Sequence, residues 1–273
     1  MNNILGLGTA AAIAAAVLPM QAGAQDTGTV LGQRVASVTF GPYARVEFGS
    51  ASPSLDGAYW LPPGDSDPQV NFDATLLDDR TGFGSAAFGY DWQNGFRAEL
   101  AIFGTGTSDF TAPCSSVSDG SPCSEHSDIT SASVSTSGFL GNVYYAPFEA
   151  QGSNSIFQPF VVAGIGIARN EVGAWTRTKN PDNPTLADNT VRTFEGATNS
   201  DFAWSVGVGA AVQVTRPGQW PVIVEAAWRY YDFGTASGGS QPVGTGSSPR
   251  EPLTFDLDTQ VISIGVRVPL QRY

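Results

Sequence analysis

The chain has 273 residues, a formal net charge of −12 and only 14% charged residues, against about 25% in an average soluble domain. That content is too small to cover the faces of many water-soluble strands, and the acidic balance excludes the basic footprint of a nucleic-acid-binding protein. The 32 Gly and 16 Phe residues, with no long helix-period stretch beyond the N-terminus, favour a folded all-β protein.

The N-terminus has the features of a signal peptide. Residues 4–18 form an apolar run of signal-peptide length, and Pro19 ends it. The small triplet Ala22-Gly23-Ala24 then offers a cleavage site. We therefore predict a signal peptide over residues 1–24 and a single domain over residues 25–273. No later apolar run is long enough for a membrane helix, so a mature chain in a membrane has to form a closed barrel.

Alternation of apolar and polar residues predicts eight strands along the mature chain. The pair Asn94-Gly95 separates the second strand from the third and is the strongest short-range signal for a hairpin. In chain order the predicted strands cover residues 38–49, 82–92, 96–104, 131–145, 159–169, 202–214, 222–234 and 257–270.

The connections between these strands alternate between long and short. An even number of strands of about ten residues, with long loops at one end and short turns at the other, is typical of a transmembrane barrel. We therefore predict an all-β, eight-stranded antiparallel up-and-down transmembrane β-barrel; a soluble barrel with its apolar face inward is the alternative. The four long polar loops are expected on the cell surface, at about residues 50–80, 104–130, 170–200 and 235–254.

The stretch FRAELAIFG, residues 96–104, indicates which face of the barrel is outside. Its apolar residues alternate with Arg97 and Glu99, and the small residues of the other strands share the charged face. Because eight strands leave a narrow interior with room for few large side chains, the charged face is expected inward. Buried charges must be paired, so we predict a lumen network of four Arg and three Glu: Arg45, Glu47, Arg97, Glu99, Glu225, Arg229 and Arg267.

Aromatic residues gather near the ends of the predicted strands. Barrels in membranes carry such aromatic girdles at both lipid–water interfaces. We predict this interface role for Trp92, Phe96, Tyr145, Phe202, Trp204, Trp228 and Tyr230.

Two cysteines, Cys114 and Cys123, lie in a polar stretch rich in Ser, Pro and Gly. In an exported chain such a pair predicts a disulfide that closes a small loop. A zinc site would need two further ligands, and only His126 is close. We therefore expect no metal and no cofactor.

Five stretches carry a family resemblance: GNVYYAPF (141–148), QPFVVAGIGIAR (158–169), FAWSVGVGAAVQV (202–214), EAAWRYYDFG (225–234) and ISIGVRVPL (262–270). They resemble the small outer-membrane β-barrel families, which include the opacity-type porins and the barrel domain of outer membrane protein A. The resemblance implies the outer membrane of a Gram-negative bacterium, and insertion by the barrel assembly machinery, which reads an aromatic-ended last strand. This chain ends in Tyr273, although Pro269 interrupts the strand and Tyr273 is out of phase with it.

The first functional hypothesis is a structural or surface-interaction role. In this hypothesis acidic loops bridge divalent cations to the phosphates of lipopolysaccharide, or meet a partner at the cell surface. The acidic residues of the first two long loops are Asp56, Asp65, Asp67, Asp73, Asp78, Asp79, Asp109, Asp119, Glu125 and Asp128.

Two other functions remain open. A narrow channel for small solutes is one, although side chains fill the interior of an eight-stranded barrel. A lipid-modifying enzyme is the other, but such barrels need a His/Ser pair at the lipid boundary. The single histidine, His126, lies beside Ser124 and Ser127 in the cysteine loop, so we expect no enzyme.

Overall fold

The computed structural model describes residues 41–76, 80–92, 94–121, 123, 128–151, 157–179, 191–215, 220–244 and 246–271. The predicted signal peptide, His126 and Tyr273 lie outside these residues. All the strands belong to one compact unit, Arg34–Tyr273. The described part of the chain holds one short helix, α1 (Pro147–Ala150), and no helix there is long and apolar enough to cross a membrane.

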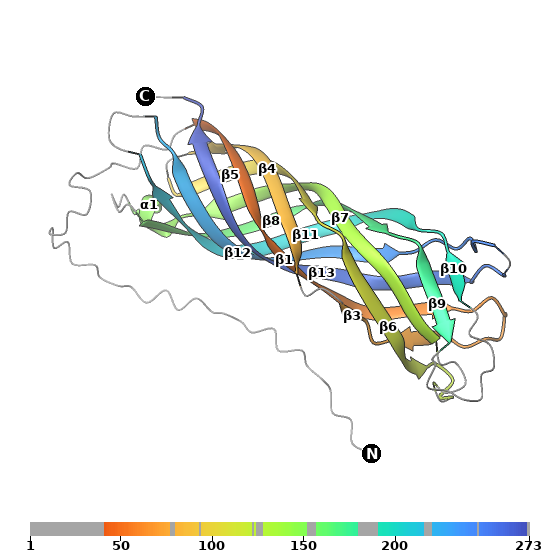
Figure 1. The fold of residues 1–273 in the computed structure, drawn as a ribbon. Helices are drawn as coiled ribbons and strands as arrows, with labels where there is room; N and C mark the ends of the chain where they lie inside the picture. Colours follow the sequence, from red (N-terminus) through yellow and green to blue (C-terminus); the bar gives the residue numbers. More distant parts are fainter. Residues whose placement is uncertain are drawn as a thin grey trace, which may run out of the picture. The chain divides into compact units, whose positions relative to one another are not determined.

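Eight strands close into a ring (Figure 1). Each pairs antiparallel with the next, and the last pairs back with the first over most of its length. The prediction of an eight-stranded up-and-down barrel is therefore confirmed. In order around the ring the strands are β1 (Gly41–Leu61), β4 (Thr81–Asp91), β5 (Phe96–Thr105), β7 (Asp128–Tyr145), β8 (Phe157–Val172), β11 (Ala197–Gln213), β12 (Ile223–Ser237) and β13 (Glu251–Pro269).

The strands run further than the sequence predicted. β1 has 21 residues and β13 has 19, so the ranges expected to be long loops hold strand over much of their length. The cause is visible in β1, where Leu55 and Trp60 continue the buried face beyond the expected end of the strand. Five further strands lie in the same loop ranges: β2 (Val70–Phe72), β3 (Thr75–Leu76), β6 (Ser108–Val117), β9 (Trp175–Lys179) and β10 (Arg192–Phe194).

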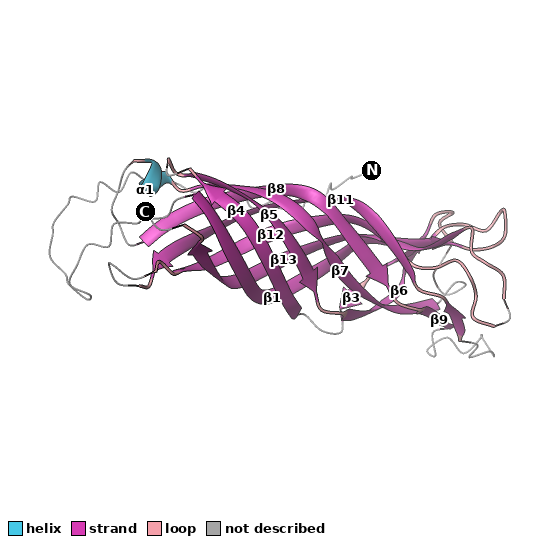
Figure 2. Ribbon diagram, turned by 90° about the horizontal axis from the view of Figure 1, so that it is seen from above, coloured by secondary structure: helices cyan, strands magenta, loops and turns pink. Residues whose placement is uncertain are grey.

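The short turn between β4 and β5 forms at the predicted Asn-Gly pair. Gly95 has a positive φ of 84°, and the Asn94 side chain accepts a hydrogen bond from the Phe96 amide at 3.1 Å. A side chain at Gly95 would also collide with Ala150 of α1, since its Cβ would lie 2.6 Å from that of Ala150. Figures 1 and 2 place α1 at the end of the ring opposite β9.

Apolar side chains cover the outside of the ring over the half nearer the short turns. Leu100 is 72% exposed and Ile102 is 67% exposed, which is costly in water and favourable in lipid. The apolar face therefore points outward, and the soluble alternative was wrong. We define the apolar belt as Val46, Phe48, Phe88, Leu100, Ile102, Phe139, Val143, Val161, Ile165, Ile167, Val206, Val208, Ile262 and Ile264.

The belt ends at one level around the ring. Ser52 lies opposite Gln260 on the β1–β13 pair, while Ser137 and Ser200 both lie opposite Arg169 of β8. Below this level β5 crosses the belt with ten residues, close to the 9–11 residues or so that a tilted strand needs to span a bilayer. Above it the ring strands and β2, β3, β6, β9 and β10 continue. We call this part the outer segment.

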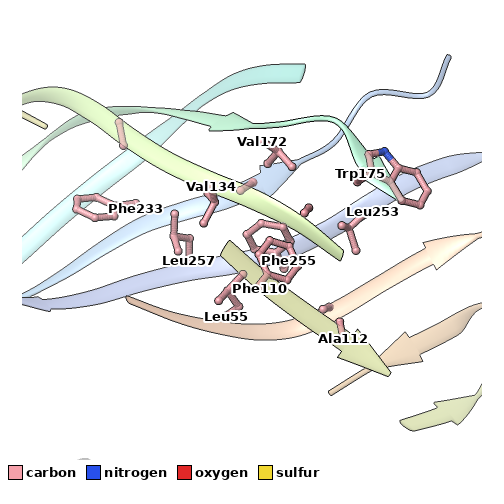
Figure 3. Close-up of a cluster of buried hydrophobic side chains, with 14 of the residues drawn as sticks. Leu55, Phe110, Ala112, Val134, Val172, Trp175, Phe233, Leu253, Phe255 and Leu257 are labelled. Atoms are coloured by element: carbon pink, nitrogen blue, oxygen red, sulfur yellow. The ribbon is translucent and has the colours of Figure 1, made fainter. Parts of the chain in front are cut away.

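A hydrophobic cluster fills the outer segment (Figure 3). It extends below the edge of the belt to Phe83 of β4 and Phe103 of β5. The Phe103 and Phe233 rings stack with centroids 5.3 Å apart, and Phe110 meets Phe255 edge-on at 5.3 Å. The expectation of few large side chains inside was wrong here, because the inward positions of the extended strands are aromatic or aliphatic. The interior of the outer segment is therefore a packed core.

Candidate functional site: the charged lumen

The lumen inside the belt holds a network of ion pairs centred on Glu99. Arg45 of β1 reaches across β4 and grips the Glu99 carboxylate of β5 with two nitrogens, Nη2 at 2.6 Å and Nε at 3.1 Å. The third guanidinium nitrogen, Nη1, donates to Glu47 at 2.8 Å, because residues two apart on a strand share a face. These side chains are almost fully buried, so the pairs are desolvated and depend on one another.

The Glu99 and Glu47 carboxylates also accept hydrogen bonds from neutral groups. Tyr144 donates to Glu99 at 2.6 Å and Tyr43 donates at 3.1 Å. The hydroxyl of Ser263 donates to Glu47 from the neighbouring strand β13. Buried carboxylates with charged and neutral donors meet the requirement that buried charges be both paired and hydrogen-bonded.

A second group of charges centres on Glu225. Its Oε1 atom accepts from Arg97 Nη1 at 2.9 Å and from Arg267 Nε at 2.8 Å. Arg267 also pairs with Asp91 at 3.0 Å. Asp91 was not among the predicted residues, although it lies two residues from Gly89 on β4 and therefore on the same inward face. With Asp91 included, four arginines face four carboxylates, so the formal charges of the buried network balance.

Tyr144 ties the two groups together. The Arg97 guanidinium lies 4.2 Å from the centre of the Tyr144 ring and 4.8 Å from that of Phe160, within cation–π range. Arg229 donates to the Tyr144 hydroxyl from the opposite side of the lumen. The structure therefore buries all seven predicted network residues in the lumen and adds Asp91, Tyr43 and Tyr144.

Inward glycines make room for these large side chains. A Cβ atom at Gly89 would lie 2.5 Å from the Tyr43 ring, and one at Gly209 would overlap the Phe160 ring. This is the physical reason that small residues share the charged face of the strands.

The predicted interface aromatics lie on the outside of the ring, at two levels. Near the short turns, Phe96 and Tyr145 are in contact with centroids 4.9 Å apart, and Trp92 contacts Tyr90. Near the outer edge of the belt, Trp204 contacts Tyr230 with centroids 5.5 Å apart. Phe202 is two residues before Trp204 on β11, and Trp228 lies opposite Val208 and Ile262, one outward position below Tyr230.

The cysteines form the predicted disulfide. Cys114 of β6 is bonded to Cys123, with Cα atoms 5.9 Å apart, on the outer segment. Of the described residues, no group of three His, Cys, Asp or Glu could hold a metal ion.

An eight-stranded ring with lipid-compatible side chains outside and paired charges inside defines a bacterial outer-membrane β-barrel. The chain matches the family described as outer membrane protein beta-barrel domain over residues 10–268, so it belongs to that family. It is 27% identical over 209 residues to outer membrane protein PagN of Salmonella typhimurium, covering 72% of this chain and 75% of that one. The protein is therefore an outer-membrane protein of a Gram-negative bacterium, as predicted.

Two solved structures are similar to this chain at low sequence identity. Neisserial surface protein A is 15% identical, with 84% of this chain and 97% of that one covered and a TM-score of 0.42. OprG of Pseudomonas aeruginosa is 14% identical, with 84% and 96% covered and a TM-score of 0.46.

Proposed function

We propose that this protein is a closed outer-membrane barrel with a structural or surface-interaction role, and that it does not conduct solutes. The observation that carries the proposal is the filling of the interior in two successive layers. The charged network occupies the lumen within the belt, and the aromatic cluster occupies the outer segment.

The two layers oppose passage in different ways. A solute in the belt region would have to separate desolvated ion pairs such as Arg45–Glu99, and breaking a buried pair is strongly unfavourable. Beyond the network, a solute would have to displace the packed rings of Phe83, Phe103, Tyr231 and Phe233. Because the layers are in series, removal of one leaves the other in place.

Planar-bilayer recording tests this proposal against the narrow-channel alternative. We expect no steady current from the wild-type protein and none from Arg97→Ala, because the aromatic layer still closes the barrel. A channel gated by the network would conduct more in Arg97→Ala than in the matched control Arg192→Ala, whose side chain is exposed on β10. Steady wild-type current, or a rise confined to Arg97→Ala, would contradict the sealed barrel.

The surface role rests on the outside of the outer segment. Asp56, Asp65, Asp67, Asp73 and Asp109 are exposed there, beyond the lipid-facing belt. We propose that they contact divalent cations and the phosphates of lipopolysaccharide, or a surface partner. Retention of lipopolysaccharide by the purified barrel should fall when a chelator removes Mg²⁺. The predicted acidic residues Asp78, Asp79 and Glu125 lie outside the described residues.

We further propose insertion by the barrel assembly machinery and no enzymatic activity. β13 is the last strand of the ring, which is the element that this machinery would read. The residues considered for catalysis, His126 with Ser124 and Ser127, lie outside the described residues.

A further inference from the structure

Four aspartates gather on the outside of the ring where β12, β13 and β1 leave the belt. Asp258 of β13 lies directly opposite Asp232 of β12 on one side and Ser54 of β1 on the other. Asp56 of β1 lies directly opposite Asp256. We call these four residues, Asp56, Asp232, Asp256 and Asp258, the carboxylate cluster.

No Lys or Arg occupies the outward positions that flank Asp258 on β1, β12 and β13. The groups that flank Asp258 are Asp232 and Tyr230 on β12, Ser52, Ser54 and Asp56 on β1, and Asp256 and Gln260 on its own strand. Two of these carboxylates accept hydrogen bonds from neutral donors: Asp256 from the Thr235 hydroxyl at 3.0 Å, and Asp232 from the Gly234 amide at 2.9 Å. Like charges placed directly opposite each other destabilise a strand pair.

The cluster lies at two β-bulges of the barrel wall, which together we call the joint. The β1–β13 register shifts after Asp56, and the β12–β13 register shifts after Asp232. The residues that follow include Gly57 with φ of 61° and Gly234 with φ of 68°, the left-handed conformation that glycine adopts readily. Such bulges bend strands and locally interrupt the ladder. The cluster therefore lies where the outer segment meets the belt and the pairing of β13 is interrupted on both sides.

Asp258 lies above the belt, outside the membrane-spanning part of β13. Burial, together with the negative charges of Asp56 and Asp232, raises the pKa of Asp258 to about 6. Asp56 is the diagonal neighbour of Asp258 across the β1–β13 pair, and two carboxyl groups can share a hydrogen bond only when one of them holds a proton. An unfolded Asp loses its proton near pH 3.9 or so. The folded joint is therefore most stable below that pH, and this stability is lost as the pH rises through about 6.

We propose that the carboxylate cluster is a pH-sensitive joint. In acid, a proton held between Asp258 and Asp56 ties β13 to β1. At neutral pH its loss leaves like charges facing one another across three strands, and the bulges open more often. The device loosens the outer segment without changing the belt or the lumen.

Hydrogen exchange of the full-length protein in lipid nanodiscs tests this proposal, with rates corrected for the intrinsic effect of pH. Wild-type amides at 52–60, 232–237 and 251–258 should be up to about tenfold better protected near pH 5 than near pH 7.5. The effect is no larger because Asp258 is half-exposed, and solvent screens its charge. Asp258→Asn should abolish the difference, because Asn cannot ionise. The control Asp109→Asn should retain it, since Asp109 lies opposite Ser133 and not opposite an acid.

Protection of the belt amides of β5 reports in each sample whether the barrel is folded. If Asp258→Asn fails to fold, Asp56→Asn is measured instead. It removes the other carboxyl group that shares the proton, so it should also abolish the pH difference. Wild-type protection that is equal at the two pH values would overturn the proposal. So would a pH difference that survives in the folded Asp258→Asn or Asp56→Asn variant.

Discussion

At the scale of single residues, Glu99 is the side chain on which the lumen depends most. It receives two nitrogens of Arg45 and the hydroxyls of Tyr43 and Tyr144 in a water-poor interior. Removing one partner from such a cluster leaves a buried charge without compensation. Removing both partners of a pair is milder, because no orphan charge remains.

Glu99→Gln should therefore destabilise the folded barrel by about 3 kcal/mol. Urea unfolding in lipid vesicles, followed by tryptophan fluorescence, measures the change. The matched control Glu195→Gln alters an exposed side chain on the outer segment and should have little effect. Equal stability of the Glu99→Gln variant and the wild type would show that the network contributes little.

Alternation along each strand was enough to predict which arginines and glutamates face inward. It did not predict their partners, because the stagger between strands sets the contacts: Arg45 skips β4 to reach Glu99 on β5. Asp91 was missed because it stands next to Trp92 at the end of a strand, where a polar residue suggests a turn. Tyr144 was missed because a tyrosine near a strand end also suits the lipid interface.

At the scale of elements, the connections of the outer segment are held by side chains as well as by strand pairing. Arg250, in the connection before β13, donates to the carbonyl oxygens of Pro62 and Asp65 at 3.1 Å each, and also to that of Asp67. One guanidinium thus joins two connections that are far apart in sequence. Hydrogen bonds donated by a charged group are stronger than neutral ones, and here one planar group satisfies three carbonyl groups.

Arg250→Ala should loosen the 62–67 turn and leave the ring intact. Limited proteolysis should cut this turn several-fold faster in the variant, with no change in the unfolding midpoint. Arg192→Ala removes an exposed arginine of the same segment and serves as the control. Unchanged cleavage in Arg250→Ala would mean that strand pairing alone holds the turn.

The disulfide is a second local constraint on the outer segment. It joins residues nine apart, so the chain-entropy argument gives a stabilisation of up to about 3 kcal/mol, confined to that loop. Replacing both Cys114 and Cys123 by Ser should raise hydrogen exchange in β6 and leave β5 unchanged. Equal loss of protection in β5 would mean that the loop and the belt unfold together.

The elements of the belt could be predicted because apolar and polar residues alternate there over the length of a bilayer-spanning strand. The outer strands were read as loops because Ser, Pro, Gly and Asp are frequent in them. Their inward positions nevertheless carry residues such as Leu55, Trp60 and Phe255, and burial of these side chains overrides the weak local preference.

At the scale of the whole molecule, two interior layers follow one another along the barrel. Paired charges occupy the lumen near the short turns, and a packed aromatic core begins at the outer edge of the belt and fills the outer segment. The alternation of long and short connections was sufficient to predict the ring and its membrane. It could not predict the outer core, because that core is built from residues of several connections that meet only in the closed ring.

Because the two layers block the barrel in series, we expect a current only when both are disrupted. Phe103→Ala with Phe233→Ala should leave bilayer current at background, because the charged network still fills the lumen. Adding Arg97→Ala to these two changes should allow a measurable current. Current from the aromatic variant alone would show that the network does not close the lumen.

The most direct test of the closed ring is the gel mobility of membrane-extracted protein in dodecyl sulfate, unheated against boiled. A ring in which β13 pairs back with β1 has no free edge at which detergent can begin to separate the strands of the belt. We therefore expect a folded band in the unheated sample and a clear shift on boiling. Identical mobility of the two samples, with full unfolding at room temperature, would contradict a closed barrel.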